Sequence, residues 1–337
     1  MPTRQLSKKP MLAGILALSF ALLAVQGIAP STACCSVAPA RFSKTKGWVG
    51  EAQKDGKLVH ILAYGNSVQN LAGGKRTSSG NAMFLPIPAV PGSMTEKNLL
   101  DMSKGKHVLA DMENACRFQT RGALRPGARP WSFGSAPRIQ VFEHGVYTVV
   151  LAQHASDIPA ALARVPVSKR PALNQKIFSA YEKWYPNWTF ALCCFENKDE
   201  QIAEPMLWWY QPQYPNVLFF PALDAHTGDV PKLNEEVDTD HFLAASSPKL
   251  DELRARTVPE LGKVYYSDHD LPSNVKALLP KNVIGQQFND KVSNGDFVMS
   301  CKDVRAGNFY PRRVVPPGTD IAAKLPNLKD LAGNQKF

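Results

Sequence analysis

Aspartate and histidine side chains gather between residues 224 and 241, with a further patch at residues 268–270. Carboxylate oxygens and imidazole nitrogens bind divalent cations, and several of them from one loop can share one coordination shell. One hypothesis from these residues is a divalent-metal-binding protein or a metal-dependent enzyme, with candidate ligands Asp224, His226, Asp229, Asp240, His241 and His269. Their spacing matches no EF-hand and no H-E-x-x-H motif. The alternative interpretation is that residues 224–229 only form side-chain-capped turns before Pro231.

The cysteines are a second group with chemistry of their own: Cys34, Cys35, Cys116, Cys193, Cys194 and Cys301. An even number of cysteines in an exported chain favours disulfides. Six cysteines allow 15 connectivities, and the sequence does not choose among them. Adjacent cysteines rarely bridge each other, so each member of a doublet is expected to have a distant partner; pairing between the doublets and of Cys116 with Cys301 is one such arrangement. A soft-metal or thiol-redox site is the alternative, although no C-x-x-C motif is present. Free thiols without a chemical role are a third interpretation.

Aromatic residues are concentrated in one segment. Twelve of the 31 lie within residues 181–220, and Trp208, Trp209 and Tyr210 follow one another directly. Neighbours on a strand point to opposite faces of a sheet, so we expect at least one of these rings to face away from the main core. Such a ring offers a stacking platform to a protein or polymer partner. The alternative is that all the rings fill the core.

Several functional classes lack support in the sequence. No G-x-S-x-G motif indicates a serine nucleophile, and the glycines at 73–74 lack the spacing of a phosphate-binding loop. The formal net charge is +10, but the basic residues are dispersed and form no stripe that would bind nucleic acid. The sequence does not decide whether the protein is an enzyme.

The N-terminal segment has the order of a secretory signal peptide. Basic residues precede an apolar run over residues 11–29, and Ser31 and Ala33 have the small side chains that a cleavage site requires. We expect removal of residues 1–33, which would place the mature chain in the periplasm or outside the cell. Two alternatives stay open: a membrane anchor formed by residues 11–29, and a lipid on Cys34.

The hydrophobic pattern predicts short strands and two helices. Strands are expected at 57–64, 81–88, 138–153, 188–196, 206–210, 217–220, 263–267, 283–288 and 297–301. The segment 138–153 reads as a hairpin that turns at His144-Gly145, and the first two strands read as a hairpin with a long tip. Helices are expected at 156–165 and at 173–185, where Pro186 stops the second one. Residues 34–56 read as irregular.

Hairpins together with segregated helices predict an α+β fold, with a mainly antiparallel sheet, a few packed helices and disulfide staples. We expect a single integrated domain over residues 34–311, with a sub-boundary near 121–137. A polar tail is expected over residues 312–337.

Several stretches resemble a family of exported bacterial proteins that carry a domain of unknown function. They are the cysteine doublet after the signal peptide, QNLAGG and NAMFLPIPA, VYTVVLAQHASDIPAAL, and YEKWYPNWTFALCCFE. The likeness implies export and one integrated α+β unit, and it implies no activity and no functional residues. From the residues themselves we expect a non-catalytic exported protein that binds a protein or polymer partner through its aromatic segment. Divalent-metal binding is the alternative.

Overall fold

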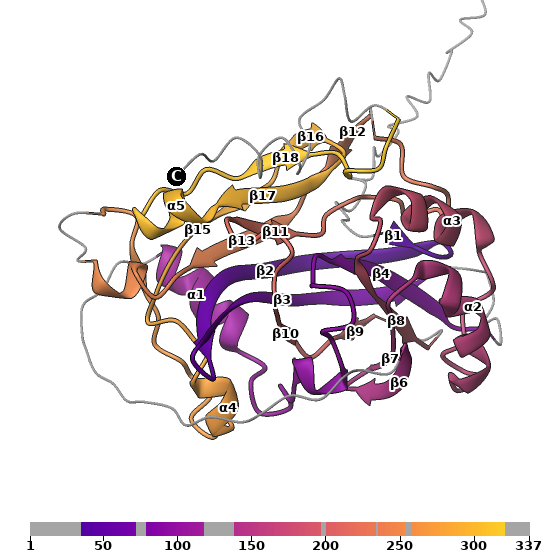
Figure 1. Cartoon of the computed structure of the whole chain (residues 1–337), viewed down its shortest axis with the longest axis horizontal. Coiled ribbons are helices and arrows are strands. Elements are labelled where there is room, and N and C mark those ends of the chain that lie inside the picture. Colours follow the sequence, from indigo (N-terminus) through magenta and orange to yellow (C-terminus); the bar gives the residue numbers. More distant parts are fainter. Residues whose placement is uncertain are drawn as a thin grey trace, which may run out of the picture.

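The computed structural model describes residues 35–71, 79–117, 138–196, 200–233, 235–253 and 258–320. Two β layers face each other across a central core, and helices cover the outer face of each layer (Figure 1). Nearly all strand pairs are antiparallel, and the described ranges contain five short α-helices. The predicted α+β class is therefore confirmed. The expected signal peptide and the sub-boundary near 121–137 lie outside the described residues.

The first layer is a five-stranded antiparallel sheet. Its strands, in spatial order, are β1 (Cys35–Ser36), β4 (Asn81–Ile87), β8 (Thr189–Phe195), β7 (Tyr147–Ala152) and β6 (Ile139–His144). The β6–β7 hairpin turns at Gly145, whose positive φ of 53° suits glycine, so the second predicted hairpin is confirmed. One face of this sheet turns to the central core and the other to the helices.

The second layer is an eight-stranded sheet. Its main path runs through β14 (Gly262–Lys263), β15 (Asn282–Phe288), β13 (His241–Ser246), β2 (Ala40–Lys54), β3 (Lys57–Asn70), β10 (Met206–Tyr210) and β5 (Leu99–Leu100), while β9 (Gln201–Ile202) pairs with β3. Only the pairing of β13 with β2 is parallel among these named strands. The long β2–β3 hairpin forms the middle of this sheet (Figure 1).

Two small sheets complete the β structure. One contains β11 (Val217–Phe220), β17 (Asp296–Ser300) and β18 (Arg312–Val314), and the other contains β12 (Glu236–Asp238) and β16 (Lys291–Ser293). Because β18 pairs with β17 and Val314 and Val315 are buried, the residues just after 311 belong to the fold. The polar tail expected from residue 312 therefore does not start there.

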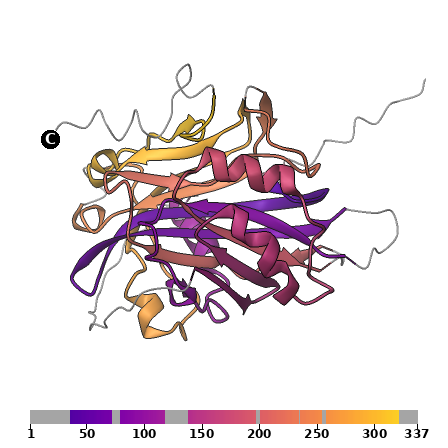
Figure 2. The ribbon, with the colours of Figure 1, turned by 45° about the vertical axis from the view of Figure 1, so that its right-hand side comes forward.

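Helices lie on the two outer faces. The segments α2 (Ile158–Ala161) and α3 (Gln175–Trp184) cover the first sheet, with their buried side chains against β4, β7 and β8 (Figure 2). On the opposite side, α1 (Val108–Arg117) and α4 (Ser273–Lys276) pack on the second sheet, and α5 (Cys301–Arg305) follows β17 directly. The Asn174 side chain caps α3 by accepting a hydrogen bond from the backbone N–H of Ile177. Among the described residues, no helix is long and apolar enough to cross a membrane.

The expectation for residues 34–56 was wrong. Residues 40–54 form β2, the longest strand in the described ranges, and Asp55-Gly56 joins it to β3 as a two-residue turn. Both turn residues have positive φ, 54° and 73°, as a turn of type I′ requires. The first half of β2 alternates between buried and exposed positions and therefore carries several polar residues. Those polar residues made the segment resemble an irregular one in the sequence.

The first predicted hairpin also differs from the structure. Residues 57–64 and 81–88 are strands, but β3 belongs to the second sheet and β4 to the first. Each long strand pairs with another partner, β3 with β2 and β4 with β8. Strands that follow each other in the sequence, β3 and β4, therefore do not pair in the structure.

The described residues contain no disulfide: Cys35, Cys116, Cys193, Cys194 and Cys301 are free thiols, and Cys34 lies outside the described ranges. Strand register explains why Cys35 of the first doublet cannot bridge Cys193 or Cys194 of the second. Cys35 stands beside Phe84 of β4, and Phe84 stands beside Leu192 of β8, so Cys35 is two strand spacings, roughly 10 Å, from β8. A disulfide spans Cα atoms up to about 7 Å apart. Cys116 and Cys301 pack on opposite faces of the second sheet.

Candidate metal centre

The six ligands predicted from the sequence are not brought together. Asp224 and His226 form an ion pair, whereas Asp229 accepts a hydrogen bond from Thr227 at the surface. Asp240 binds the backbone of β2, and the exposed His269 contacts Lys276 through its carbonyl oxygen. No three of the six form a group with converging ligand atoms within the described ranges.

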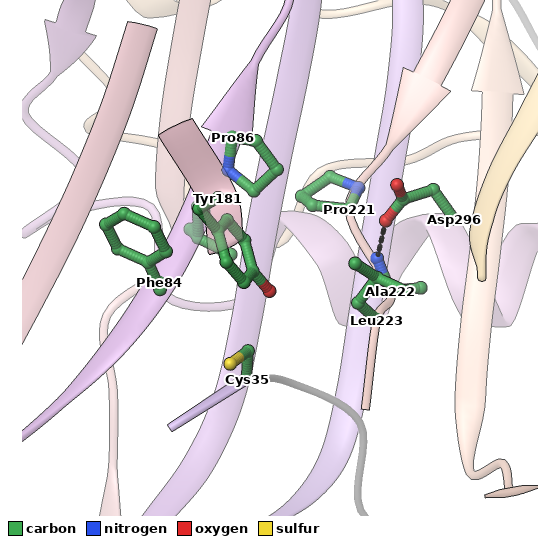
Figure 3. Close-up of a pocket in the computed structure, with 9 residues that line it drawn as sticks. Cys35, Phe84, Pro86, Tyr181, Pro221, Ala222, Leu223 and Asp296 are labelled. Atoms are coloured by element: carbon green, nitrogen blue, oxygen red, sulfur yellow. Dashed lines mark hydrogen bonds between the residues drawn. The ribbon is translucent and has the colours of Figure 1, made fainter. Parts of the chain in front are cut away.

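Part of the predicted set belongs to a buried and half-buried group that we call the acid cluster: Asp224, His226, His241, Asp296 and Arg313. Asp296 accepts a hydrogen bond from the Tyr185 hydroxyl at 2.6 Å. It accepts another from the Ala222 N–H at 2.9 Å (Figure 3). Burial raises the pKa of Asp296 to about 6, while these donors act to lower it. The carboxylate lone pairs are thus largely used by donors of the protein itself.

The basic members of the acid cluster are also enclosed. Burial lowers the pKa of Arg313 to about 10, against the attraction of Asp296 and Asp224. Its guanidinium stacks on Phe297 at 4.3 Å from the ring centre, and its Nε donates to the carbonyl oxygen of Ser293. Burial also lowers the pKa of His241 to about 3, and the charges of Arg313 and His226 act in the same direction.

A narrow cavity borders this cluster. Cys35, Tyr181, Pro221 and Asp296 are among its lining residues, and Figure 3 shows Asp296 turned toward the Ala222 backbone. The space between the atoms is about 190 Å³, yet no part of it accepts a water-sized sphere. A ligand therefore has no room beside Asp296.

The aromatic segment proposed as a binding platform is core. Trp208, Trp209 and Tyr210 are 0%, 6% and 0% exposed, because β10 is an inner strand with buried faces on both sides. Trp208 and Tyr210 face the core between the sheets, and Trp209 packs on the side of α1 and α4. The rings do alternate between faces as expected, but neither face is open to a partner.

A different group of side chains converges near the turn end of the β2–β3 hairpin. Glu51, His60 and Cys301, which we call the thiol cluster, have ligand atoms that lie within 4.8 Å of one another, and all three residues are buried. The register of the β2–β3 hairpin places Glu51 directly opposite His60, and Tyr210 of β10 lies on the other side of His60. Cys301 comes from the first position of α5.

Some polar atoms of the thiol cluster have hydrogen-bond partners and others have none. Cys301 Sγ lies 3.9 Å from His60 Nε2 and 3.6 Å from the carbonyl oxygen of Pro215. Arg305, one helical turn after Cys301, donates two hydrogen bonds to Glu51, at 2.9 and 2.5 Å. By contrast, His60 Nδ1 and the Tyr210 hydroxyl are buried without a hydrogen-bond partner among the described residues. Unpartnered buried polar atoms are rare and call for an explanation.

Electrostatics keeps the sulfur and the imidazole neutral. Burial lowers the pKa of His60 to about 4, so the ring is uncharged at neutral pH. Burial also raises the pKa of the Cys301 thiol, and the negative charge of Glu51 raises it further. A cysteine nucleophile needs a lowered pKa and access to substrate, so this arrangement does not suit covalent catalysis.

The donor set does fit a zinc ion. Zinc binds thiolate, imidazole and carboxylate ligands, and a tetrahedral ion would hold sulfur and nitrogen about 3.6 Å apart. The observed 3.9 Å between Cys301 Sγ and His60 Nε2 is close to that separation. Two anionic ligands, the thiolate and the carboxylate, would balance the charge of the ion.

One signal in the sequence could have located half of this site. Asp-Gly between alternating segments is the strongest short-range hairpin signal, and pairing outward from Asp55-Gly56 puts Glu51 opposite His60. Nothing in the sequence indicates that Cys301, more than 200 residues later, lies above that pair.

Comparisons with known proteins add little. No family model matches the chain, and no curated protein matches it. Among solved structures, the crystal structure of baculovirus P35 is similar with a TM-score of 0.33 and 15% sequence identity, over 79% of this chain and 90% of that one. A likeness at that TM-score carries no argument about fold or function.

Proposed function

We propose that the protein binds one zinc ion through Glu51, His60 and Cys301. The observation that carries this proposal is the convergence of three buried ligand atoms within 4.8 Å, from three separate segments. A carboxylate, an imidazole and a thiol together form a donor set that suits zinc better than magnesium or calcium, which prefer oxygen ligands.

The surrounding residues support the site. Arg305 uses both guanidinium bonds on Glu51 and so orients that carboxylate, as outer partners of metal ligands commonly do. Glu51 would turn one oxygen to the ion and keep the other on Arg305. Zinc would also remove the proton of Cys301 and so offset the cost of a buried thiolate.

The ion would have a binding role and not a catalytic one. All three ligands are buried, so a substrate could not reach an open coordination position. Zinc would instead join α5 to the β2–β3 hairpin, and ligand binding to the folded state alone stabilises that state.

Zinc titration of the full-length protein tests the proposal. After treatment with a chelator, the protein should bind one zinc ion per chain in competition with a chromophoric chelator. Cys301→Ser should weaken binding at least about tenfold, because it replaces a thiolate by a neutral hydroxyl. Cys116→Ser is the matched control, since Cys116 lies outside the thiol cluster.

Cobalt substitution gives an independent readout. Cobalt bound to a thiolate shows a charge-transfer band in the near ultraviolet, which should appear in the wild type and in Cys116→Ser and be absent from Cys301→Ser. Zinc binding that is equal in both variants, or no zinc binding by a folded wild type, would overturn the proposal.

Zinc binding requires the Cys301 sulfur as a free thiol. Alkylation of the unfolded protein without reductant should therefore modify Cys301, which intact mass measures. A Cys301 that resists alkylation would overturn the proposal. Export, and membership of the family that the sequence resembles, stay predictions.

A further inference from the structure

A polar hollow of about 230 Å³ opens at the surface beside a bulge in β2. Its lining residues come from β2, α1 and the ends of β13 and β15: Lys44, Thr45, Lys46, Glu113, Arg117, Asp240, Gln287 and Asn289. Sites for drug-sized ligands usually span about 300–1,000 Å³, so this one suits a smaller molecule. The hollow shares no residue with the thiol cluster, so a ligand bound in it does not depend on zinc.

The bulge places an unusual residue at the hollow. Ser43 pairs with Ser67 and Lys46 pairs with Gly65, so Lys44 and Thr45 together face one residue of β3. Lys44 has a φ of 54°, in a region that residues with a side chain rarely adopt. Such a conformation persists where its surroundings hold it, often at a binding site.

Asp240 holds the bulge in place. One of its carboxylate oxygens accepts a hydrogen bond from the Lys44 N–H at 3.4 Å, and the other accepts one from the Gln287 side chain at 3.1 Å. This aspartate, which the sequence suggested as a metal ligand, is therefore occupied by donors of the protein.

The hollow carries a net positive charge. Glu113 is bound by Lys46 and, at 2.5 Å, by Arg117. Lys44 forms no ion pair with a carboxylate in the described part of the chain. Three cations and two anions leave one positive charge in excess.

We propose that this hollow binds a small molecule through a phosphate or carboxylate group, held by Lys44 and Arg117. One guanidinium nitrogen of Arg117 donates to Glu113, which leaves the other donors of its planar fork for an oxyanion. Lys44 supplies the uncompensated charge, while Thr45 and Asn289 offer neutral hydrogen-bonding groups to the rest of the ligand.

Glu113 competes with such a ligand for Lys46 and Arg117, so two substitutions should act in opposite directions. Lys44→Asn removes the free charge, and asparagine tolerates the positive φ at this position. Glu113→Gln releases both cations and should strengthen binding. Lys176→Asn removes the same charge from the exposed surface of α3 and is the matched control.

Isothermal titration at low ionic strength tests the proposal, with inorganic phosphate, glycerol 3-phosphate and acetate as probes. We expect at least one probe to bind, about tenfold weaker in Lys44→Asn, several-fold tighter in Glu113→Gln and unchanged in Lys176→Asn. Preference for the two phosphates or for acetate identifies the group recognised.

Two results would overturn the proposal. The first is no heat of binding for any probe with a folded wild type at millimolar concentrations. The second is an equal loss in Lys44→Asn and Lys176→Asn, which would mean that the anion responds only to the net charge of the protein. Circular dichroism of each variant confirms that it is folded.

Discussion

The acid cluster and the thiol cluster both hold polar side chains inside the protein, but they differ in how their ligand atoms are arranged. In the acid cluster, Asp296 accepts hydrogen bonds from Tyr185 and Ala222, and within the described ranges no three residues of the cluster form a group of converging ligand atoms. In the thiol cluster, the ligand atoms of Glu51, His60 and Cys301 lie within 4.8 Å of one another. Each cluster contains buried polar atoms without a partner among the described residues, so convergence of ligand atoms is what separates the two.

The density of ligand-type residues along the chain pointed to the acid cluster. Asp224 and His226 are two residues apart and pair with each other, but they converge with no third ligand within the described ranges. Glu51, His60 and Cys301 are dispersed in the sequence, yet their ligand atoms converge. Density along the chain therefore did not predict convergence in space.

The largest expected effect of a single substitution is the loss of Asp296. Asp296→Leu should lower the free energy of unfolding by about 3–5 kcal/mol, because it leaves the buried Arg313 without its main counter-charge. Urea denaturation measures the change. The exposed Asp229→Asn should stay within about 0.5 kcal/mol of the wild type. A small effect of Asp296→Leu would mean that the acid cluster does not stabilise the fold.

Zinc should distinguish the clusters next. At a free zinc concentration 100 times Kd, the free energy of unfolding should rise by about 2.7 kcal/mol. The gain should vanish in Cys301→Ser and remain in Tyr185→Phe, which alters only the acid cluster. Denaturation with and without zinc measures both. Equal stabilisation of the two variants by zinc would contradict the proposal that zinc binds at the thiol cluster and not at the acid cluster.

Acid should weaken the protein through both clusters. The pKa values of His60 and His241 are lowered to about 4 and about 3, so the unfolded chain takes up their protons first. As pH falls from about 6.5 toward 4, each histidine should cost about 1.4 kcal/mol of stability per pH unit. Asp296 acts in the opposite sense below pH 6, because its pKa is raised.

Urea denaturation between pH 7 and 4 measures this dependence, and His241→Gln should reduce the slope. Zinc should flatten the part due to His60 only, since an imidazole bound to the ion resists protonation. A slope that is the same in wild type and His241→Gln would show that this histidine is not buried in its neutral form.

The same substitution, tyrosine to phenylalanine, can be made once in each cluster and is expected to have the smallest effects. Tyr185→Phe loses the hydrogen bond to Asp296 and should cost about 1–2 kcal/mol. Tyr210→Phe removes a hydroxyl without a partner, so without zinc it should be neutral or slightly stabilising. Thermal unfolding of both variants without zinc checks the order. A reversed order would mean that the Tyr210 hydroxyl is satisfied after all.

Local patterns predicted most elements but few of their partners. The helix ending before Pro186, the hairpin at Gly145 and the strand 206–210 are present because each depends on neighbours in the chain. The 57–64 strand was also correct, but its pairing with 81–88 was not, because the gap between them leaves register to the rest of the sheet.

The aromatic segment shows the same limit. Alternation correctly predicted that Trp208 and Trp209 face opposite sides, yet exposure depends on what covers each side. Helix α1 covers one face of β10 and the first sheet covers the other, and neither is adjacent in the chain.

By itself, the sequence determined the α+β class and most of the antiparallel strands. Asp55-Gly56 also encodes the turn that pairs Glu51 with His60, although residues 34–56 were expected to be irregular. Only the tertiary structure decided that Cys301 completes the thiol cluster and that Lys44 lines a hollow. It also decided that Cys35 stands two strand spacings from β8 and that Cys116 and Cys301 pack on opposite faces of the second sheet. The physical reason is range. Turn geometry and side-chain alternation act over a few residues, whereas burial and convergence depend on elements that meet only after the whole chain has packed.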